Sequence, residues 1–567
     1  MSAPYRARLF GTRHMASAGH YLAAQAALQI LENGGNAIDA GVAGGIALGV
    51  LQSDYVSFGG VAPIMIQLAE TGEVITISGL GPWPRAASVD YFRDNHDGLM
   101  PKGIMRTVVP AAPDAWITAL TRYGTISFAE AAGAALRFAR DGFPIAPLTA
   151  TVIEKYREDY AAYPSSAAIY LPDGAPPKAG DLFVQSDLGR TIQYMIDEET
   201  SAAGGGREAG LEAARAAFYR GDIAREMVRY HAENGGWLAA EDLATFRSDV
   251  DPALRFTFGD TEVFTCGPWC QGPLLGQTLQ MLDGFDFRSA GYNTSAYIHH
   301  VVEAAKLAYS DRHHFYGDPK FVDVPIEILA SQEYAAERRK AINPHEAYRG
   351  MPAPGKIGRP GADAAPRPFV DDGAQLDTSY ICVVDSAGNA FSATPSDSSV
   401  GAPVIPGLGF VPSTRGSQSW TDPRVPAVLA PGKRPRLTPN PAFARRGREW
   451  MMPFGSPGND MQPQAMIQVF LNIVVWGMNP QNAVEAPRFG SVSYPRSSEP
   501  HAFDPGLLQL EGRISDSTAD ALADLGHDVK RWPDWEWVSG AVCAIVAEPG
   551  RMEGAADPRR PSGVAGW

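Results

Sequence analysis

Residues 377–394 read DTSYICVVDSAGNAFSAT, and this stretch decides the fold. Residues 379–384 are rich in β-branched and aromatic side chains. Residues 385–389 carry the Asp, Gly and Asn of a turn, and residues 390–394 form a second short apolar run. The pattern predicts a β-hairpin with Thr378 immediately before its first strand.

The segment in front of this hairpin has a very different composition. Of the 26 residues from Arg349 to Ala374, fifteen are Pro, Gly or Ala. Such a composition buries little apolar surface, so we expect an exposed, mobile segment. A mobile segment that ends directly before a core hairpin is typical of a processing site. On composition alone, the alternative is an ordinary surface loop.

Cleavage before Thr378 would give this residue both a hydroxyl nucleophile and a free α-amine. An α-amine has an unperturbed pKa of about 7.7–8.0, so it can act as a general base at neutral pH. Such chemistry also needs donors for an oxyanion. The tight loop Gly455–Asn459 can present backbone N–H groups, although such a loop is often only a turn. The G-x-S-x-G, H-E-x-x-H and P-loop motifs of other hydrolases are absent from the sequence.

Composition excludes several classes of protein. The chain has 567 residues and a net charge of −15, with 48 basic against 63 acidic residues, so we expect no nucleic-acid partner. The longest apolar run, residues 465–478, is interrupted by two polar side chains and is too short to cross a bilayer. No secretory signal is recognised at the N-terminus. We therefore expect a cytoplasmic protein without a membrane partner.

Metal and cofactor sites are not expected. Cys266 and Cys270 lack a matching ligand pair nearby, which favours two buried thiols over a metal site. The adjacent histidines 299–300 and 313–314 point in different directions on a helix, and no carboxylate accompanies them at ligand spacing.

Periodicity predicts helices near the N-terminus and in the middle of the chain. We expect two helices within residues 17–51, with Ser17 and Asn36 as N-caps and a break at Gly34-Gly35. The Ala- and Gly-rich sequence of the second helix implies close packing. Strands are expected at residues 64–68 and 74–77, and an amphipathic helix at residues 297–312.

Ordered sequence blocks resemble the γ-glutamyltranspeptidase (glutathione hydrolase) family. They span nearly the whole chain: ALQILENGGNAIDAGVA (27–43), VEAAKLAYSDRHHFYGDPKFVDVP (302–325), DTSYICVVDSAGNAFSAT (377–394), GKRPRLTPNP (432–441), GSPGND (455–460), NAVEAPRF (482–489) and GAADPRRPSGVAGW (554–567). The resemblance implies an α/β fold, the four-layer αββα sandwich of N-terminal-nucleophile (Ntn) hydrolases, made as an autoprocessed precursor.

The resemblance also implies cleavage between Asp377 and Thr378. The products would be a large chain of residues 1–377 and a small chain of residues 378–567, which together form one folded unit. Thr378 would be the nucleophile, and Ser396 stands where the family has a second threonine that bonds it. Gly458 and Asn459 stand at the glycine pair whose N–H groups bind the oxyanion. A dimer of such two-chain units is one expected assembly.

The substrate-binding positions depart from the family pattern. Ser78 stands where the family has the arginine that binds the α-carboxylate of a glutamyl group. Leu437 and Thr438 stand where the family has two serines that help to hold this carboxylate. Ser398, Arg415 and Gln418 stand where the family has Asn, Gln and Asp side chains that hold the α-amine. An ammonium group beside Arg415 would be repelled, with no acidic partner to offset the charge, whereas a carboxylate would be attracted.

We therefore expect an amidohydrolase for a small amide whose acyl group carries a carboxylate but no α-amine, with oxamate as the leading substrate. The alternatives are a γ-glutamyltransferase or glutathione hydrolase, a glutaryl-type cephalosporin acylase, and an uncleaved scaffold protein. A metal hydrolase is the least favoured. Arg415 could also be a solvent-exposed loop residue.

Overall fold

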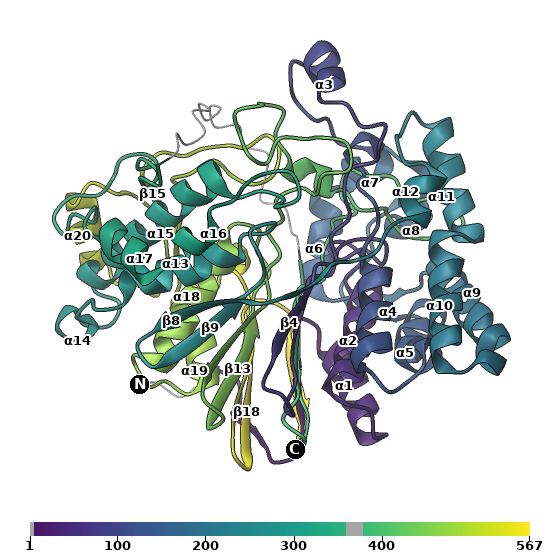
Figure 1. The fold of residues 1–567 in the computed structure, drawn as a ribbon, viewed down its shortest axis with the longest axis horizontal. Helices are drawn as coiled ribbons and strands as arrows, with labels where there is room; N and C mark the ends of the chain where they lie inside the picture. Colours follow the sequence, from purple (N-terminus) through teal and green to yellow (C-terminus); the bar gives the residue numbers. More distant parts are fainter. Residues whose placement is uncertain (1–4, 359–377) are drawn as a thin grey trace.

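The computed structural model describes residues 5–358 and 378–567. Two antiparallel sheets lie face to face at the centre of these residues (Figure 1). The strand order of the first sheet is β1 (Leu9–Gly11), β18 (Arg551–Ala556), β17 (Cys543–Glu548), β13 (Trp450–Gly455), β12 (Ala442–Arg446), β9 (Thr261–Thr265) and β8 (Leu254–Phe258). The order of the second is β19 (Gly563–Gly566), β2 (Met15–Ala18), β10 (Ile381–Val384), β11 (Ala390–Ala393), β3 (Ile64–Gln67), β4 (Val74–Ile77) and β7 (Val250–Pro252).

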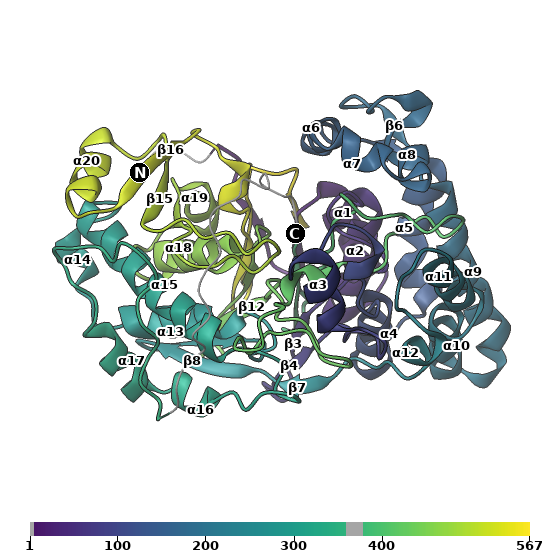
Figure 2. The same cartoon turned by 90° about the horizontal axis from the view of Figure 1, so that it is seen from above.

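Helices cover the outer face of each sheet, which gives the order helix, sheet, sheet, helix (Figures 1 and 2). The second sheet is covered by α1 (Tyr21–Glu32) and α2 (Ala37–Leu51), which pack in turn on α4 (Ala112–Tyr123) and α5 (Phe128–Asp141). The first sheet is covered by α13 (Gly272–Leu282), α15 (Ser295–Phe315), α18 (Met461–Val474) and α19 (Pro480–Glu485). The four-layer αββα sandwich expected from the sequence is confirmed.

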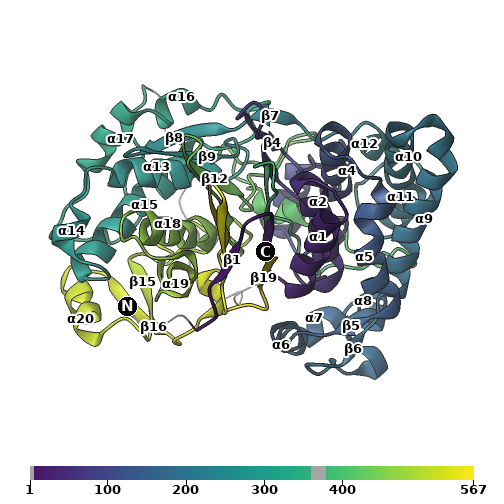
Figure 3. The same cartoon turned by 90° about the horizontal axis from the view of Figure 1, so that it is seen from below.

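The remaining elements lie around this sandwich. On the same side of the sheets as α4 and α5 lie α6 (Pro147–Lys155), α7 (Arg157–Ala161), α8 (Pro164–Tyr170), α9 (Ser186–Ala202), α10 (Arg207–Tyr219), α11 (Asp222–Glu233) and α12 (Ala240–Ala244) (Figure 3). On the opposite side lie α14 (Phe287–Ala290), α16 (Ile326–Leu329), α17 (Gln332–Arg339), α20 (Asp516–Asp524) and the strands β14 (Phe489–Ser491), β15 (Leu507–Glu511) and β16 (Asp528–Trp532). The others are α3 (Val89–His96), β5 (Phe143–Pro144) and β6 (Leu182–Phe183). No helix in residues 5–358 and 378–567 is long and apolar enough to span a bilayer.

The predicted hairpin forms the middle of the second sheet. β10 pairs with β11 in the register Ile381↔Ala393 to Val384↔Ala390. All four residues of β10 are buried, because one face packs on the first sheet and the other on α2. The Asp385 carboxylate accepts the N–H groups of Ala387 and Asn389 and fixes the turn.

The small residues of α2 allow this helix to lie very close to its neighbours. A Cβ atom at Gly41 would overlap the Phe391 ring of β11, and one at Gly45 would overlap Trp116 of α4. The close packing expected from the Ala- and Gly-rich sequence is therefore confirmed. Asn36 caps the helix as expected and accepts the N–H groups of Ile38 and Asp39.

Two expectations about local structure are wrong. Ser17 does not cap a helix, because it lies in β2 between β10 and β19, and His20 caps α1 instead. The segment that begins at Arg349 is not exposed throughout. Gly355 is buried and donates its N–H to Asp311 of α15 at 2.9 Å. Residues 359–374 and Asp377 lie outside the described residues.

Candidate active site

Thr378 lies at the entrance to β10 in a strained backbone conformation. It is fully buried, and its φ angle is +78°. A β-branched residue is rare at positive φ, and such a conformation costs about 1–3 kcal/mol. Two contacts hold the backbone in place: Thr378 N donates to the Tyr55 carbonyl at 3.1 Å, and Arg560 donates to the Thr378 carbonyl at 3.2 Å. The strain is thus located at the predicted nucleophile.

The Ser396 hydroxyl lies against the Thr378 hydroxyl. Ser396 exchanges two backbone hydrogen bonds with Val61 just beyond the end of β11, which fixes its position. Its Oγ atom is 2.6 Å from Thr378 Oγ1. The structure therefore brings together these two hydroxyl groups, 18 residues apart in the sequence.

Gln462 also touches the Thr378 hydroxyl, and we did not predict it. It lies in the first turn of α18, is fully buried, and donates from Nε2 to Thr378 Oγ1 at 3.2 Å. Its Oε1 atom is buried without a hydrogen-bond partner among the described residues. The Gln-x-Gln sequence after the glycine loop is the only local signal, and it does not distinguish Gln462 from Gln464.

The loop before α18 contains the two predicted oxyanion donors, both with positive φ angles. Gly458 has φ +121° and Asn459 has φ +49°, a left-handed conformation that asparagine tolerates better than most residues. Neither backbone N–H donates a hydrogen bond to any residue that the structure describes. Gln271 accounts for the loop geometry, because its Nε2 donates to the carbonyls of Asn459 and Thr438, both at 2.9 Å.

Arg415 is a buried part of this site and not a surface loop residue. Its side chain is 4% exposed, and Nη2 donates to Ser396 Oγ. The expectation that no acidic group accompanies it is wrong, because Asp397 Oδ1 lies 3.5 Å from Arg415 Nε. The Asp397 carboxylate also accepts hydrogen bonds from Ser413 Oγ at 2.6 Å and Thr414 N at 3.0 Å. Asp397 therefore anchors the loop that carries Arg415.

Gln418 and Thr438 bind each other. Gln418 Nε2 donates to Thr438 Oγ1 at 2.8 Å, and Thr438 N donates to Gln418 Oε1 at 3.0 Å. Ser398 is placed differently: its hydroxyl donates to the Asp54 carbonyl at 3.2 Å. Ser78 Oγ accepts the Asp249 N–H at 3.0 Å. Among the described residues, the hydrogen bonds place Arg415 next to the Thr378–Ser396 pair but do not connect Ser398 to it.

Asp54 is a buried carboxylate beside the site that the sequence did not reveal. Both of its carboxylate oxygens are buried without a hydrogen-bond partner among the described residues. Burial raises its pKa to about 7, an effect that the charge of Arg560 partly opposes. Its neighbour Tyr55 accepts the Thr378 N–H. The segment that holds the nucleophile therefore contains a carboxyl group with a pKa of about 7.

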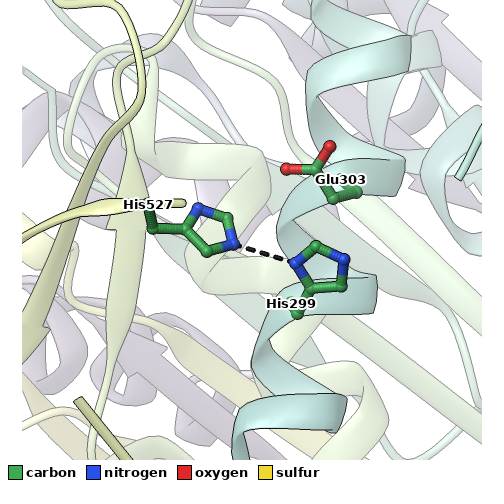
Figure 4. Close-up of side chains that lie close together, drawn as sticks. All are labelled: His299, Glu303 and His527. Carbon is green, nitrogen blue, oxygen red and sulfur yellow. Dashed lines mark hydrogen bonds between the residues drawn. The ribbon is translucent and has the colours of Figure 1, made fainter. Parts of the chain in front are cut away.

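A second buried cluster joins α15 to the segment between α20 and β16 (Figure 4). His299 Nδ1 lies 2.9 Å from His527 Nε2, and His299 Nε2 lies 2.7 Å from the Asn343 carbonyl. Glu303, four residues after His299 on α15, completes a group whose potential ligand atoms lie within 4.8 Å of one another, so the expectation that no carboxylate accompanies these histidines at ligand spacing is wrong. However, Glu303 already forms a buried ion pair with Lys306 at 2.7 Å. A divalent cation here would lie near a buried ammonium group, so the geometry favours a structural cluster.

Cys266 and Cys270 are buried and carry no disulfide. Burial raises the pKa of the Cys266 thiol well above its usual range. This agrees with the prediction of two buried thiols.

A family model described as Gamma-glutamyltranspeptidase matches residues 23–567. The chain belongs to this family. The Glutathione hydrolase-like YwrD proenzyme of Bacillus subtilis (strain 168) is 30% identical over 98% of this chain and 99% of its own length. The Acylase ACY 1 proenzyme of Pseudomonas sp. (strain SE83) is 31% identical over 96% of this chain and 92% of its own.

Two further members of the family are informative. The Oxamate amidohydrolase proenzyme of Klebsiella pneumoniae subsp. pneumoniae is 28% identical over 98% of this chain and 99% of its own length. The crystal structure of cephalosporin acylase from Bacillus halodurans superposes with a TM-score of 0.85 at 28% identity, covering 100% of this chain and 98% of that one. These γ-glutamyltranspeptidase-family relatives carry different activities in their names, so family membership alone does not identify the substrate.

Proposed function

We propose that this chain is a self-processing Ntn amidohydrolase that acts on a small amide with a carboxylate in its acyl group, with oxamate as the leading substrate. The observation that carries the proposal is the contact of Arg415 with Ser396, whose hydroxyl lies 2.6 Å from Thr378 Oγ1. The guanidinium group is therefore within two hydrogen-bond lengths of the nucleophile.

This short separation favours an acyl group whose carboxylate is close to the scissile carbonyl. In oxamate the carboxylate is bonded directly to the carbonyl carbon, so an attack by Thr378 brings it near Arg415. In a glutaryl or γ-glutamyl group, three methylene or methine carbons separate the two. A guanidinium group binds a carboxylate through paired, charge-assisted hydrogen bonds.

Asp397 does not cancel this preference. Its carboxylate is 3.5 Å from Arg415 Nε and already accepts hydrogen bonds from the Ser413–Thr414 segment. It offsets part of the Arg415 charge and orients the guanidinium group, so that Nη2 donates to Ser396 Oγ beside the nucleophile. A substrate ammonium at the same place would still meet a cation.

Self-cleavage is the first step of the proposed mechanism. Thr378 Oγ1 attacks the carbonyl carbon of Asp377, the peptide bond shifts to an ester, and water hydrolyses that ester. The products are the chains 1–377 and 378–567, which stay folded together. The positive φ of Thr378 supports this step, because cleavage frees the strained backbone. The relatives named as proenzymes support it as well.

Turnover then uses the new N-terminus. The α-amine of Thr378 takes the hydroxyl proton while Oγ1 attacks the amide carbon. The N–H groups of Gly458 and Asn459 stabilise the oxyanion, and ammonia leaves with the transferred proton. Water, activated by the same amine, hydrolyses the acyl-enzyme and releases the dicarboxylate.

A substrate panel tests the proposal. Ammonia release from oxamate should exceed turnover of glutaryl-p-nitroanilide and γ-glutamyl-p-nitroanilide, in kcat/KM, and no acceptor dipeptide should be needed. Preferred turnover of the glutaryl anilide would instead favour an acylase, the activity named for two of the relatives. Preferred turnover of the γ-glutamyl anilide, accelerated by glycylglycine, would indicate a γ-glutamyltransferase.

A further inference from the structure

We infer that Gln462 is a catalytic residue: its carboxamide is a fixed hydrogen-bond donor to the reacting oxygen of Thr378. This inference rests on the proposed function, since it takes Thr378 as the nucleophile. The contact between Gln462 and Thr378 follows neither from the family relationship nor from the sequence pattern.

The position of Gln462 is rigid. The residue is fully buried in the first turn of α18, and its backbone N–H donates to the Asn459 carbonyl at 3.2 Å. The same residue therefore links the oxyanion loop, through its backbone, to Thr378 Oγ1, through its side chain. A donor held in this way needs little reorganisation during the reaction.

The chemistry of the hydroxyl group gives this donor a function. An amide N–H can only donate, so Gln462 Nε2 occupies one of the two acceptor sites of Thr378 Oγ1. The Thr378 proton is then directed away from Gln462, and it remains available to the α-amine that cleavage creates. During deacylation Oγ1 leaves with negative charge, and the N–H group stabilises that charge.

The unpartnered end of the carboxamide is the second observation. A buried acceptor without a hydrogen bond costs about 1–3 kcal/mol, and Gln462 Oε1 is such an acceptor among the described residues, as are the Oε1 atoms of Gln52 and Gln185 elsewhere in the chain. Gln464 and Gln468 on the same helix show the contrast. Both use the oxygen and the nitrogen of their carboxamides in hydrogen bonds to the main chain near β14.

Two variants and one matched control test the inference. Gln462→Met keeps the volume and removes the donor, and Gln462→Glu replaces the donor by a group that donates only when protonated. Gln468→Met is the control, because it removes buried hydrogen bonds from the same helix without a contact to Thr378. The thermal midpoint of each protein reports on folding.

The first readout is chain cleavage after cell-free synthesis, which needs no knowledge of the substrate. Gln462→Met should cleave about 100-fold more slowly than the wild type, as expected when one preorganised donor is lost, and Gln468→Met should cleave at the wild-type rate. Equal rates for wild type and Gln462→Met would overturn the inference. A wild type that does not cleave would overturn the proposed function itself, which is a distinguishable result.

The pH profile is the second readout, and a structural role would not change it. Wild-type kcat should rise with pH as the α-amine loses its proton. With Gln462→Glu, kcat should fall again at higher pH as the carboxyl ionises and ceases to donate, while KM changes little. A Gln462→Glu profile with the wild-type shape would contradict a role as donor.

Discussion

Thr378 and Ser396 place their hydroxyl oxygens 2.6 Å apart on neighbouring strand ends of one hairpin. Arg415 donates to the same Ser396 oxygen, so a cation, a hydroxyl and the nucleophile follow one another in a short chain. In the proposed function, this arrangement selects a substrate that carries a carboxylate. The guanidinium group is thus linked to the nucleophile through one hydroxyl group, that of Ser396.

Arg415 can be tested with a charged and a neutral substrate. We expect Arg415→Met to lower kcat/KM for oxamate by about 100-fold or more, because a buried carboxylate loses its charged partner. Arg415→Lys should lose less. Oxamide, the uncharged diamide, is the control, and its turnover should fall much less. An equal fall for both amides would mean that Arg415 only supports Ser396.

Asn459 can be tested through its backbone conformation. Its φ of +49° suits glycine, and its proposed contribution is a backbone N–H. We expect Asn459→Gly to retain activity within a few-fold of the wild type. Asn459→Val should lose most activity, because a β-branched residue is strained at this φ. If Asn459→Gly were as inactive as Asn459→Val, the side chain and not the N–H group would carry the function.

Because the pKa of Asp54 is raised in the fold, we expect the stability of the protein to depend on pH. Its pKa is about 7 in the folded chain, against 3.8 for an unperturbed aspartate, so the folded chain binds more protons at Asp54 than the unfolded chain between these values. The contribution of Asp54 to the free energy of unfolding should therefore fall as the pH rises from about 4 to about 7, while buried histidines with lowered pKa values, such as His20 and His231, act in the opposite direction. We expect Asp54→Asn to remove this slope. Urea unfolding at pH 5 and pH 7.5, in an uncleaved Thr378→Ala background, measures it; unchanged slopes would refute the assignment.

We expect the buried cluster of His299, Glu303 and His527 not to bind a metal ion. Lys306 already forms a buried ion pair with Glu303, so a divalent cation would lie near a buried ammonium group. Excess EDTA should leave activity and the thermal midpoint unchanged, and added Zn²⁺ should not raise the midpoint. A rise that His527→Ala abolishes would show that the cluster is a metal site.

Local sequence signals predicted the elements that depend on local chemistry. The Asn36 cap and the hairpin around Asp385 follow from neighbouring residues alone. The helix predicted at residues 297–312 is present as α15, but it is buried on nearly all sides and not amphipathic as expected. Ser17 was assigned wrongly because β2 is defined by its pairing with β10 and β19, which are distant in sequence.

The candidate site shows the same difference between residues that the sequence predicted and residues whose roles depend on distant contacts. The resemblance to the family placed Ser396 beside Thr378, and the hairpin of β10 and β11 brings the two residues together in the structure. Gln462, Asp397 and Asp54 could not be found in this way. Their roles depend on contacts with residues far away in the chain, such as the 3.2 Å bond from Gln462 to Thr378 across 84 positions.

The most direct test of the account is an intact-mass spectrum of the purified protein beside its Thr378→Ala variant. The account predicts two wild-type fragments, residues 1–377 and 378–567, and a single 60.7 kDa chain for the variant. A single uncut chain in both samples would contradict the assignment of Thr378 as an N-terminal nucleophile and would favour a scaffold protein.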